Sequence, residues 1–184
     1  MKTIVRNIGN GDQAIMKTLD HMIRLARRDA RTPDVRTLAK KLSLSCKLSD
    51  KIEKECCQVK SAFDWVVDNI TYKYDHQHVT EWVDVENPNT TEFLIAPKHQ
   101  LGVLVGDCDD MSMMLASILG AMGFNVKYKV IAWRGQEYTH VYVEVLMPNV
   151  EGEYRWIPMD PVAGKNGFAW EKSPVIRKHY VDVF

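Results

Sequence analysis

The sequence predicts one α+β domain in which helices come first and a small antiparallel sheet follows. Between residues 12 and 70, apolar side chains recur at three- and four-residue steps, the period of helices that bury one face. Between residues 126 and 160 the pattern changes to β-branched and aromatic runs that alternate with polar residues, as in half-buried strands. We expect strands at 126–133, 140–147 and 154–160, and residues 175–184 are a candidate edge strand. A chain of 184 residues is long enough to bury a proper core.

Three helices are predicted in the N-terminal part of the chain. The first spans Asp12 to Arg31, and its apolar residues fall on one face. Thr32 and Pro33 fit the N-cap and first position of the second helix, because proline lacks the N–H that a helix start leaves unpaired. Ser49 is the predicted cap of the third helix, which continues to Ile70.

A cysteine stands at the start of a further, strongly apolar helix. Cys108 belongs to Gly106-Asp107-Cys108-Asp109-Asp110, and apolar residues recur with helical spacing from Met111 to Met122. The first turn of a helix presents unpaired N–H groups and the positive end of the macrodipole, and both favour a thiolate. The alternative is a buried cysteine that packs as a small hydrophobic residue, which is the more common fate of a lone cysteine.

The three aspartates around this cysteine act differently on the helix and on the thiol. Asp107 suits an N-cap, and Asp109 and Asp110 suit the first turn. Their negative charges should raise the pKa of Cys108, so a thiolate near neutral pH requires a cationic imidazole close by. Helix capping is the simpler role for Asp109 and Asp110. A metal site made of the three aspartates is disfavoured, because the segment lacks the glycine and distal glutamate of a calcium-binding loop.

Two later strands place a histidine and an aspartate after the cysteine in chain order. One strand starts at His140, and its polar residues share the face of that histidine. The next, 154–160, ends at Asp160, which precedes a proline and is therefore disfavoured in a helix. A thiol, a base and a group that orients the base are the components of nucleophilic catalysis, so Cys108, His140 and Asp160 are the candidate set.

At these residues the chain resembles the transglutaminase-like superfamily, and more narrowly its small bacterial and phage-encoded members. Residues 62–72 are also similar to the helix and turn that precede the cysteine in such proteins, so the resemblance spans roughly residues 60–163. The blocks that carry it are Gly106-Asp107-Cys108-Asp109-Asp110, His140-Val141-Tyr142-Val143-Glu144-Val145 and Trp156-Ile157-Pro158-Met159-Asp160-Pro161.

The resemblance implies a papain-like α+β core in which the helix of the cysteine packs on the sheet. Residues 49–184 would form this core, and residues 1–48 an N-terminal helical region. The catalytic residues would be Cys108, His140 and Asp160, acting through a thioester on peptide or side-chain amide bonds. Hydrolysis, as in a protease or deamidase, is expected over crosslinking, because small proteins of this kind lack the extra domains of tissue-type crosslinking enzymes. The alternative is a structural or binding protein, such as a phage virion or assembly component, that keeps this core.

The transition state of acyl transfer requires hydrogen-bond donors aimed at a developing oxyanion. The backbone N–H of Cys108 is the first predicted donor, since it lies at the helix start. Gln100 or the indole of Trp82 is the second, and the sequence does not choose between them. Residues 71–105 show weak periodicity, and a loop of this length usually has a function. We expect it, including its turn-rich part at 84–92, to form one wall of the substrate cleft.

The other cysteines and the histidines of the long loop suggest neither a disulfide framework nor a metal site. Cys46, Cys56 and Cys57 are not spaced as a framework and no signal peptide is evident, so we expect free thiols. His76 and His78, with His99, lack a third ligand at recognisable spacing and indicate a solvated loop. We expect a cytoplasmic location in a bacterial host cell, or association with a virion.

Charge and hydropathy exclude further classes of partner. Lysine plus arginine equals aspartate plus glutamate at 24 each, so there is no electrostatic case for binding nucleic acid. No apolar run approaches the length that spans a bilayer. The expected partner is a protein or peptide substrate, with a virion or assembly partner if the protein is phage-encoded. The implied mechanism requires no cofactor and no metal.

Overall fold

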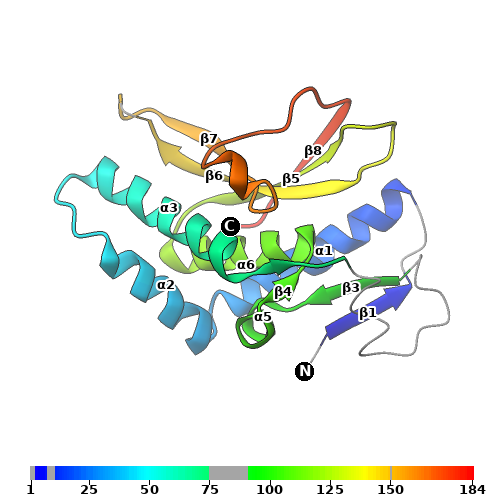
Figure 1. Cartoon of the computed structure of the whole chain (residues 1–184), viewed down its shortest axis with the longest axis horizontal. Helices are drawn as coiled ribbons and strands as arrows, with labels where there is room; N and C mark the ends of the chain where they lie inside the picture. The colour runs from blue at the N-terminus through cyan, green and yellow to red at the C-terminus, as the bar shows by residue number, and fades with distance from the viewer. Residues whose placement is uncertain (1–2, 8–10, 75–90, 150) are drawn as a thin grey trace.

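The computed structural model describes residues 3–7, 11–74, 91–149 and 151–184, and it confirms the α+β class. Figure 1 shows a four-stranded sheet along one side of the molecule and the helices along the other. The elements of these two layers are α1 (Asp12–Asp29), α2 (Pro33–Ser45), α3 (Lys51–Asn69), α5 (Pro97–Val103), α6 (Cys108–Met122), β5 (Val126–Ala132), β6 (His140–Pro148), β7 (Tyr154–Met159) and β8 (Arg177–Asp182). Within the described residues, no helix is both long and apolar enough to cross a membrane.

The sheet has the strand order β7-β6-β5-β8, and every neighbouring pair is antiparallel. The three strands predicted at 126–133, 140–147 and 154–160 are confirmed to within one residue at each end. The predicted edge strand is β8, which pairs with β5 after a 3-10 turn at Gly164–Asn166. Alternation along β5 and β6 gives one face of buried valines toward the helices and an opposite face that carries charged and aromatic residues.

Helix α6 lies at the centre of the fold, because it contacts the sheet as well as α1, α2, α3 and α5. Every residue from Asp109 to Leu119 is buried, so this helix has no solvated face over that span. The hydroxyl of Ser117 donates to the carbonyl of Met113 at 2.8 Å and lies 3.2 Å from the carbonyl of Ala26 in α1. The buried hydroxyl of Ser117 is thus satisfied by the backbone of α6 itself and of its neighbour α1.

Asp110 connects the first turn of α6 to a strand outside the main sheet. It is fully buried, and its Oδ1 accepts a hydrogen bond of 2.7 Å from the backbone N–H of Ile95. Ile95 is the last residue of β3 (Thr91–Ile95), which pairs antiparallel with β1 (Thr3–Asn7). The aspartate that the sequence assigned to capping therefore also fixes the position of β3.

The predicted N-terminal helices are present, with small shifts at their ends. α1 ends two residues earlier than predicted, at Asp29, and α2 starts at Pro33 as predicted. The N-cap of α3 is Asp50, whose Oδ1 accepts from the N–H of Glu53 at 2.9 Å, so the prediction of Ser49 is wrong by one residue. Serine and aspartate are equally good N-caps, which is why the sequence alone did not separate them.

The prediction of one long loop over residues 71–105 is wrong in part. Besides β3 and α5, this region contains β2 (Thr71–Tyr72) and β4 (Val105–Gly106), which pair in parallel. Elements this short carry too few residues for a period to be visible in the sequence. Residues 75–90 lie outside the described residues, and with them Trp82, His76 and His78 and most of the segment 84–92.

A disulfide joins Cys46 to Cys57, with their Cα atoms 5.8 Å apart. The prediction that these two cysteines are free is therefore wrong. Cys46 caps the C-terminus of α2 and Cys57 lies in the second turn of α3, so the hairpin of the two helices brings them together. Of the neighbouring pair, Cys56 stays a free thiol, as does Cys108.

One large hydrophobic core runs through most of the described elements, and a small separate cluster contains Phe93 and Ile95 of β3. The large core includes Met22 of α1 and Ala39 of α2 together with Leu115 of α6 and Val143 of β6. The predicted division into residues 1–48 and 49–184 stays a prediction, and the core crosses that boundary.

Replacing Asp110 by alanine should destabilise the fold, because the buried N–H of Ile95 loses its acceptor. The expected loss in the free energy of unfolding is about 1–3 kcal/mol, the cost of an unsatisfied buried donor. Urea denaturation followed by fluorescence measures it. Asp110→Asn keeps an acceptor oxygen of similar size and should lose less. Equal losses in the two variants would show that the hydrogen bond is not the source.

Candidate active site

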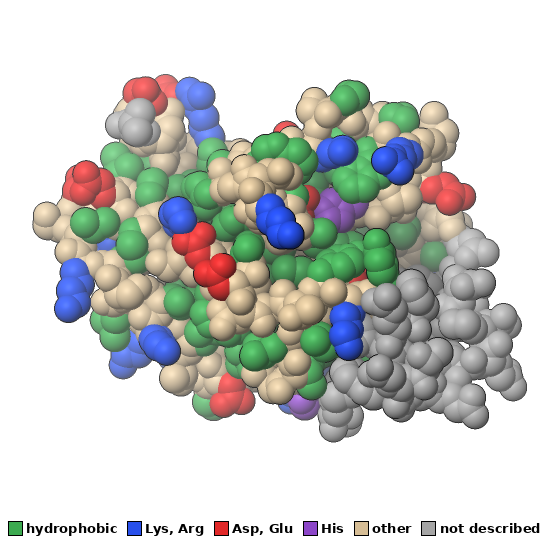
Figure 2. Space-filling model, in the orientation of Figure 1, with side chains coloured by type: hydrophobic (Ala, Val, Ile, Leu, Met, Phe, Trp, Pro, Cys, Tyr) green, Lys and Arg blue, Asp and Glu red, His purple; other side chains and the backbone are tan. Residues whose placement is uncertain are grey.

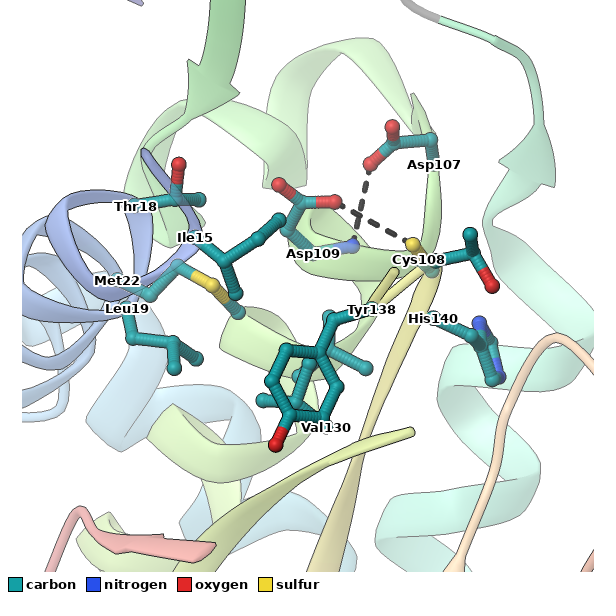
Figure 3. Close-up of a pocket in the computed structure, with 12 residues that line it drawn as sticks. Ile15, Thr18, Leu19, Met22, Asp107, Cys108, Asp109, Val130, Tyr138 and His140 are labelled. Atoms are coloured by element: carbon teal, nitrogen blue, oxygen red, sulfur yellow. Dashed lines mark hydrogen bonds between the residues drawn. The ribbon is translucent and has the colours of Figure 1, made fainter. Parts of the chain in front are cut away.

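A cavity of about 240 Å³ lies between helix α1, the start of α6 and the start of β6. Figure 2 shows hydrophobic side chains gathered around a histidine in a hollow of this face, and Figure 3 shows the residues that line the cavity. They come from α1, from Asp107–Asp109, from Val130 on β5 and from Tyr138–Val141. Two of the predicted catalytic residues, Cys108 and His140, therefore border one space.

Cys108 is the first residue of α6, as the sequence predicted. The N-cap is Asp107, whose Oδ1 accepts from the N–H of Asp109 at 3.1 Å. The thiol of Cys108 donates to Asp109 Oδ1, with 3.4 Å between sulfur and oxygen, as the dashed lines in Figure 3 show. On its other side, the backbone N–H of Val141 donates to the sulfur.

The surroundings of Cys108 keep its thiol protonated in this conformation. Burial of the sulfur raises the pKa of Cys108 well above its usual value, and the charges of Asp107 and Asp109 raise it further. The N–H of Val141 acts in the opposite direction, because it stabilises the thiolate. The effect of the aspartates is the one expected from the sequence. The predicted ion pair of thiolate and imidazolium stays a prediction, and it requires the sulfur to leave Asp109.

The backbone of Val141 docks the start of β6 onto the start of α6. Strand β7 pairs with β6 only as far as Val143, which is opposite Met159, so β7 does not reach Val141. On the side that β7 does not reach, residues of α6 bond to the backbone of Val141. Its N–H donates to the sulfur of Cys108, and its C=O accepts from the hydroxyl of Ser112 at 3.1 Å. Because the neighbouring residue in the chain is His140, this docking places the base at the end of β6 beside the cavity.

His140 is held by the third predicted residue. Its Nε2 lies 2.8 Å from Asp160 Oδ2, and both side chains are buried. The other oxygen of Asp160 accepts from the backbone N–H groups of Val162 and Ala163, at 3.1 and 3.4 Å. An ionised carboxylate only accepts, so Nε2 carries the ring hydrogen and Nδ1 is left as the basic nitrogen. A general base needs one ring nitrogen without a hydrogen, and this tautomer provides it.

Two aromatic side chains lie against the imidazole, and one of them, Trp133, was not singled out from the sequence. Trp133 stacks on His140 with ring centroids 5.6 Å apart, and Tyr142 lies 5.8 Å away in a tilted arrangement. Lys172 Nζ lies 4.8 Å from the Trp133 ring on a cation–π contact. The place of Trp133 depends on strand register, which the sequence does not reveal. Ile131 is opposite His140, so Trp133, which directly follows β5, lies beside the histidine.

Charged residues join the chain after β7 to the polar face of the sheet, next to His140. Lys129 Nζ lies 3.1 Å from Glu144 and also contacts Glu171, and the hydroxyl of Tyr142 donates to Glu171 at 2.5 Å. Burial opposes ionisation of Glu171, but the hydrogen bonds from Lys129 and Tyr142 outweigh it and lower the pKa of that carboxyl. The expectation that Tyr142 and Glu144 share the face of His140 is met.

Gln100 lies beneath the loop before the cysteine, not among the residues that line the cavity. It is fully buried, and its Nε2 donates to the carbonyl of Val105 at 3.3 Å. A Cβ on Gly106 would lie 2.7 Å from this nitrogen, so glycine is required for the close approach. Gln100 thus shapes the segment that leads into Cys108. Its role as an oxyanion donor stays a prediction, as does that of Trp82, which is outside the described residues.

Three side chains at the start of α6 form a group that could ligate a metal ion. The ligand atoms of Asp107, Cys108 and Asp109 all lie within 4.8 Å of one another. The set differs from the one weighed on the sequence, because Asp110 points to Ile95 instead. Proximity of acidic groups does not by itself indicate a metal, and the expectation that none is needed stays a prediction.

Residues 43–161, more than half of the chain, match the model of the transglutaminase-like superfamily. The chain belongs to this superfamily. The match includes all three predicted catalytic residues and the helix of the cysteine, and it leaves α1 outside. No curated protein sequence matches the chain.

Solved structures with a similar arrangement include three from distant proteins. A proposed cysteine protease from Cytophaga hutchinsonii is 12% identical with a TM-score of 0.49, over 91% of this chain and 56% of that one. A proposed protease from Parabacteroides distasonis is 13% identical with a TM-score of 0.49, over 88% and 28%. Rad4–Rad23 bound to a 6-4 photoproduct UV lesion is 13% identical with a TM-score of 0.43, over 85% and 41%. This chain therefore spans only part of each, and these similarities say nothing about activity.

Replacing Asp109 by asparagine should make Cys108 reactive at lower pH. The change removes a negative charge that raises the pKa of Cys108, and it replaces the charged acceptor of the thiol proton by a neutral and weaker one. The rate of alkylation by iodoacetamide, measured at Cys108 by peptide mass spectrometry between pH 5 and 10, should rise at lower pH than in the native protein. Asp107→Asn removes a charge without a bond to the thiol and should shift the profile less. An unchanged profile in Asp109→Asn would contradict the assigned contact.

Proposed function

We propose that this chain is a cysteine-dependent acyl-transfer enzyme that acts on peptide or side-chain amide bonds through a thioester on Cys108. One observation carries the proposal: Cys108 and His140 border a single cavity, and buried Asp160 holds the far nitrogen of the histidine. Membership of the transglutaminase-like superfamily supports a cysteine-dependent enzyme in general.

The first half-reaction transfers the acyl group to sulfur. Rotation about the Cα–Cβ bond of Cys108 is the smallest movement that takes the thiol from Asp109 toward His140. Nδ1 of His140 then accepts the thiol proton, and the sulfur attacks the carbonyl carbon, forming a carbon–sulfur bond. The developing oxyanion accepts from the backbone N–H of Cys108, one of the groups at the start of α6 without an intrahelical acceptor. The carbon–nitrogen bond breaks, and the imidazolium gives its proton to the leaving amine.

The second half-reaction releases the acyl group. His140 takes a proton from water, the oxygen attacks the thioester carbon, and the carbon–sulfur bond breaks as the proton passes to sulfur. The products are a carboxylic acid and the regenerated thiol. An amine that enters in place of water gives a new amide, which is crosslinking. We propose hydrolysis as the main outcome, because it needs no second binding site.

The chemistry can be tested with p-nitrophenyl acetate, which acylates a nucleophilic thiol without requiring the natural substrate. The native protein should release a burst of nitrophenolate and carry an acetyl group on Cys108, located by peptide mass spectrometry. His140→Ala should slow this acylation roughly 10²–10⁴-fold, because it removes the general base. His179→Ala, which removes a histidine of β8 outside the cavity, is the matched control. Acetylation that is equally fast at Cys56, or unaffected in His140→Ala, would exclude the proposed mechanism.

The same acyl-enzyme distinguishes hydrolysis from crosslinking. With added glycine ethyl ester, an acyltransferase yields the acetyl amide, whereas a hydrolase yields acetate at an unchanged rate. We expect acetate as the main product, and we expect EDTA to leave both half-reactions unchanged. If the amide were the main product, the assigned activity would be transamidation and not hydrolysis, and the role of Cys108 would stay the same.

Asp160→Asn should impair acylation although it keeps the shape of the side chain. The carboxamide can still accept from the N–H groups of Val162 and Ala163, but its amino group then faces Nε2 of His140. The ring hydrogen moves to Nδ1, which can no longer accept the thiol proton, and the wrong tautomer slows the reaction. We expect a loss of about ten-fold or more in the acylation rate, with a thermal unfolding midpoint close to that of the native protein. An undiminished rate would show that Asp160 has only a structural role.

A further inference from the structure

Helix α1 lies outside the residues that match the superfamily, yet it supplies one wall of the cavity at Cys108. Figure 3 shows its side chains on one side of this space and Cys108 and His140 on the other. Ile15, Leu19 and Met22 make this wall apolar, and Val130 lies between the two sides. This wall is next to Cys108 and is not part of the shared core. It can therefore give this chain a substrate preference of its own.

The size and lining of the cavity fit a single aliphatic side chain. About 240 Å³ is roughly the space of eight water molecules at ~30 Å³ each, which is the scale of one side chain and not of a folded partner. Leu19 and Met22 are 3% and 0% exposed, so the floor is fixed by the core, whereas Ile15 at the rim is only partly buried. The carboxylates of Asp107 and Asp109 at the opposite side disfavour an acidic side chain.

Thr18 gives this wall one polar atom that the protein does not satisfy. The residue is 6% exposed, and within the described part of the chain its Oγ1 has no hydrogen-bond partner. Buried hydroxyls are nearly always bonded, because an unpaired one is destabilising. The oxygen itself is almost inaccessible, so it lies behind the apolar surface of the wall, and the surface that a bound side chain meets is aliphatic.

We propose that α1 forms a specificity pocket for a medium-sized aliphatic side chain, such as leucine or methionine, next to the carbonyl that Cys108 attacks. Ile15 and Leu19 contact that side chain, and fully buried Met22 supports them from behind. The substrate class is thus a peptide with an aliphatic residue at the acylated position. The inference rests on the proposed acyl transfer at Cys108.

Peptidyl chloromethyl ketones with leucine, glycine or glutamate beside the ketone test the pocket separately from turnover. The sulfur of Cys108 displaces chloride and forms a thioether, so neither water nor an amine acceptor is involved. Labelling rates at Cys108 are divided by the iodoacetamide rate of the same protein, which removes differences in thiol reactivity. We expect the leucine probe to react at least ten-fold faster than the glycine probe, since a few buried methylenes give 10–200-fold discrimination, and the glutamate probe to react slowest.

Two variants of α1 identify the wall. Ile15→Trp should fill the rim and reduce the ratio of leucine to glycine labelling to near one, whereas Met16→Trp, on a neighbouring residue that does not line the cavity, should keep the native ratio. Thr18→Val keeps the shape and removes the unpaired hydroxyl. It should keep the native ratio of leucine to glycine labelling while the thermal unfolding midpoint stays equal or rises, because the hydroxyl lies behind the surface that the side chain meets.

Each outcome bears on a different claim. Rapid, His140-dependent iodoacetamide labelling with a leucine-to-glycine ratio near one in the native protein would overturn the pocket and leave the acyl-transfer proposal intact. Equal losses of selectivity in Ile15→Trp and Met16→Trp would also overturn it. Slow labelling of Cys108 by every reagent, without dependence on His140, would contradict the proposed function and the pocket with it.

Discussion

The active-site geometry depends on one contact between helix and sheet: the backbone of Val141 is bonded by the first turn of α6. Strand β7 stops short of this residue, and Cys108 and Ser112 take the place of a neighbouring strand. The proposed nucleophile, Cys108, is therefore part of the junction that holds the proposed base, His140. His140 stands next to Val141 in the chain, so these hydrogen bonds hold the backbone of His140 beside the backbone of Cys108, and rotation of the Cys108 side chain sets the remaining separation of thiol and imidazole.

The imidazole of His140 is fixed in position, whereas the thiol of Cys108 is bonded to Asp109 and not to the imidazole. Asp160 and Trp133 hold the imidazole from its edge and from its face, with Nδ1 left basic. Cys108, by contrast, donates to Asp109 in a setting that disfavours its ionisation. A substrate that displaces the carboxylate, or excludes it by filling the cavity, would release the thiol toward the base. Chemistry would then be coupled to occupation of the site, and an empty site would hold a neutral thiol.

Much of this architecture follows from sequence patterns, and what does not follow depends on contacts between distant segments. Long periodic runs predicted α1, α2, α3 and the strands of the sheet. Cys108, His140 and Asp160 were selected from their order in the chain, and their catalytic role stays a prediction, although Cys108 and His140 line one cavity and His140 bonds to Asp160. The two-residue strands around residues 71–106 left no period to detect. The place of Trp133 beside His140 depends on strand register, and Thr18 enters the cavity only because α1 packs against α6. The pairing of Cys46 with Cys57, and not with Cys56, depends on which side of α3 faces α2.

The disulfide between Cys46 and Cys57 means that the redox conditions chosen to protect Cys108 also change the covalent structure of the hairpin of α2 and α3. Reducing agents that protect Cys108 from oxidation also open this link, which closes a short loop and is of a kind worth about 2–4 kcal/mol in many proteins. Preparations kept in dithiothreitol and preparations kept in air are therefore two covalent species. Any comparison of melting curves or turnover between them mixes the state of the scaffold with the state of the reactive sulfur.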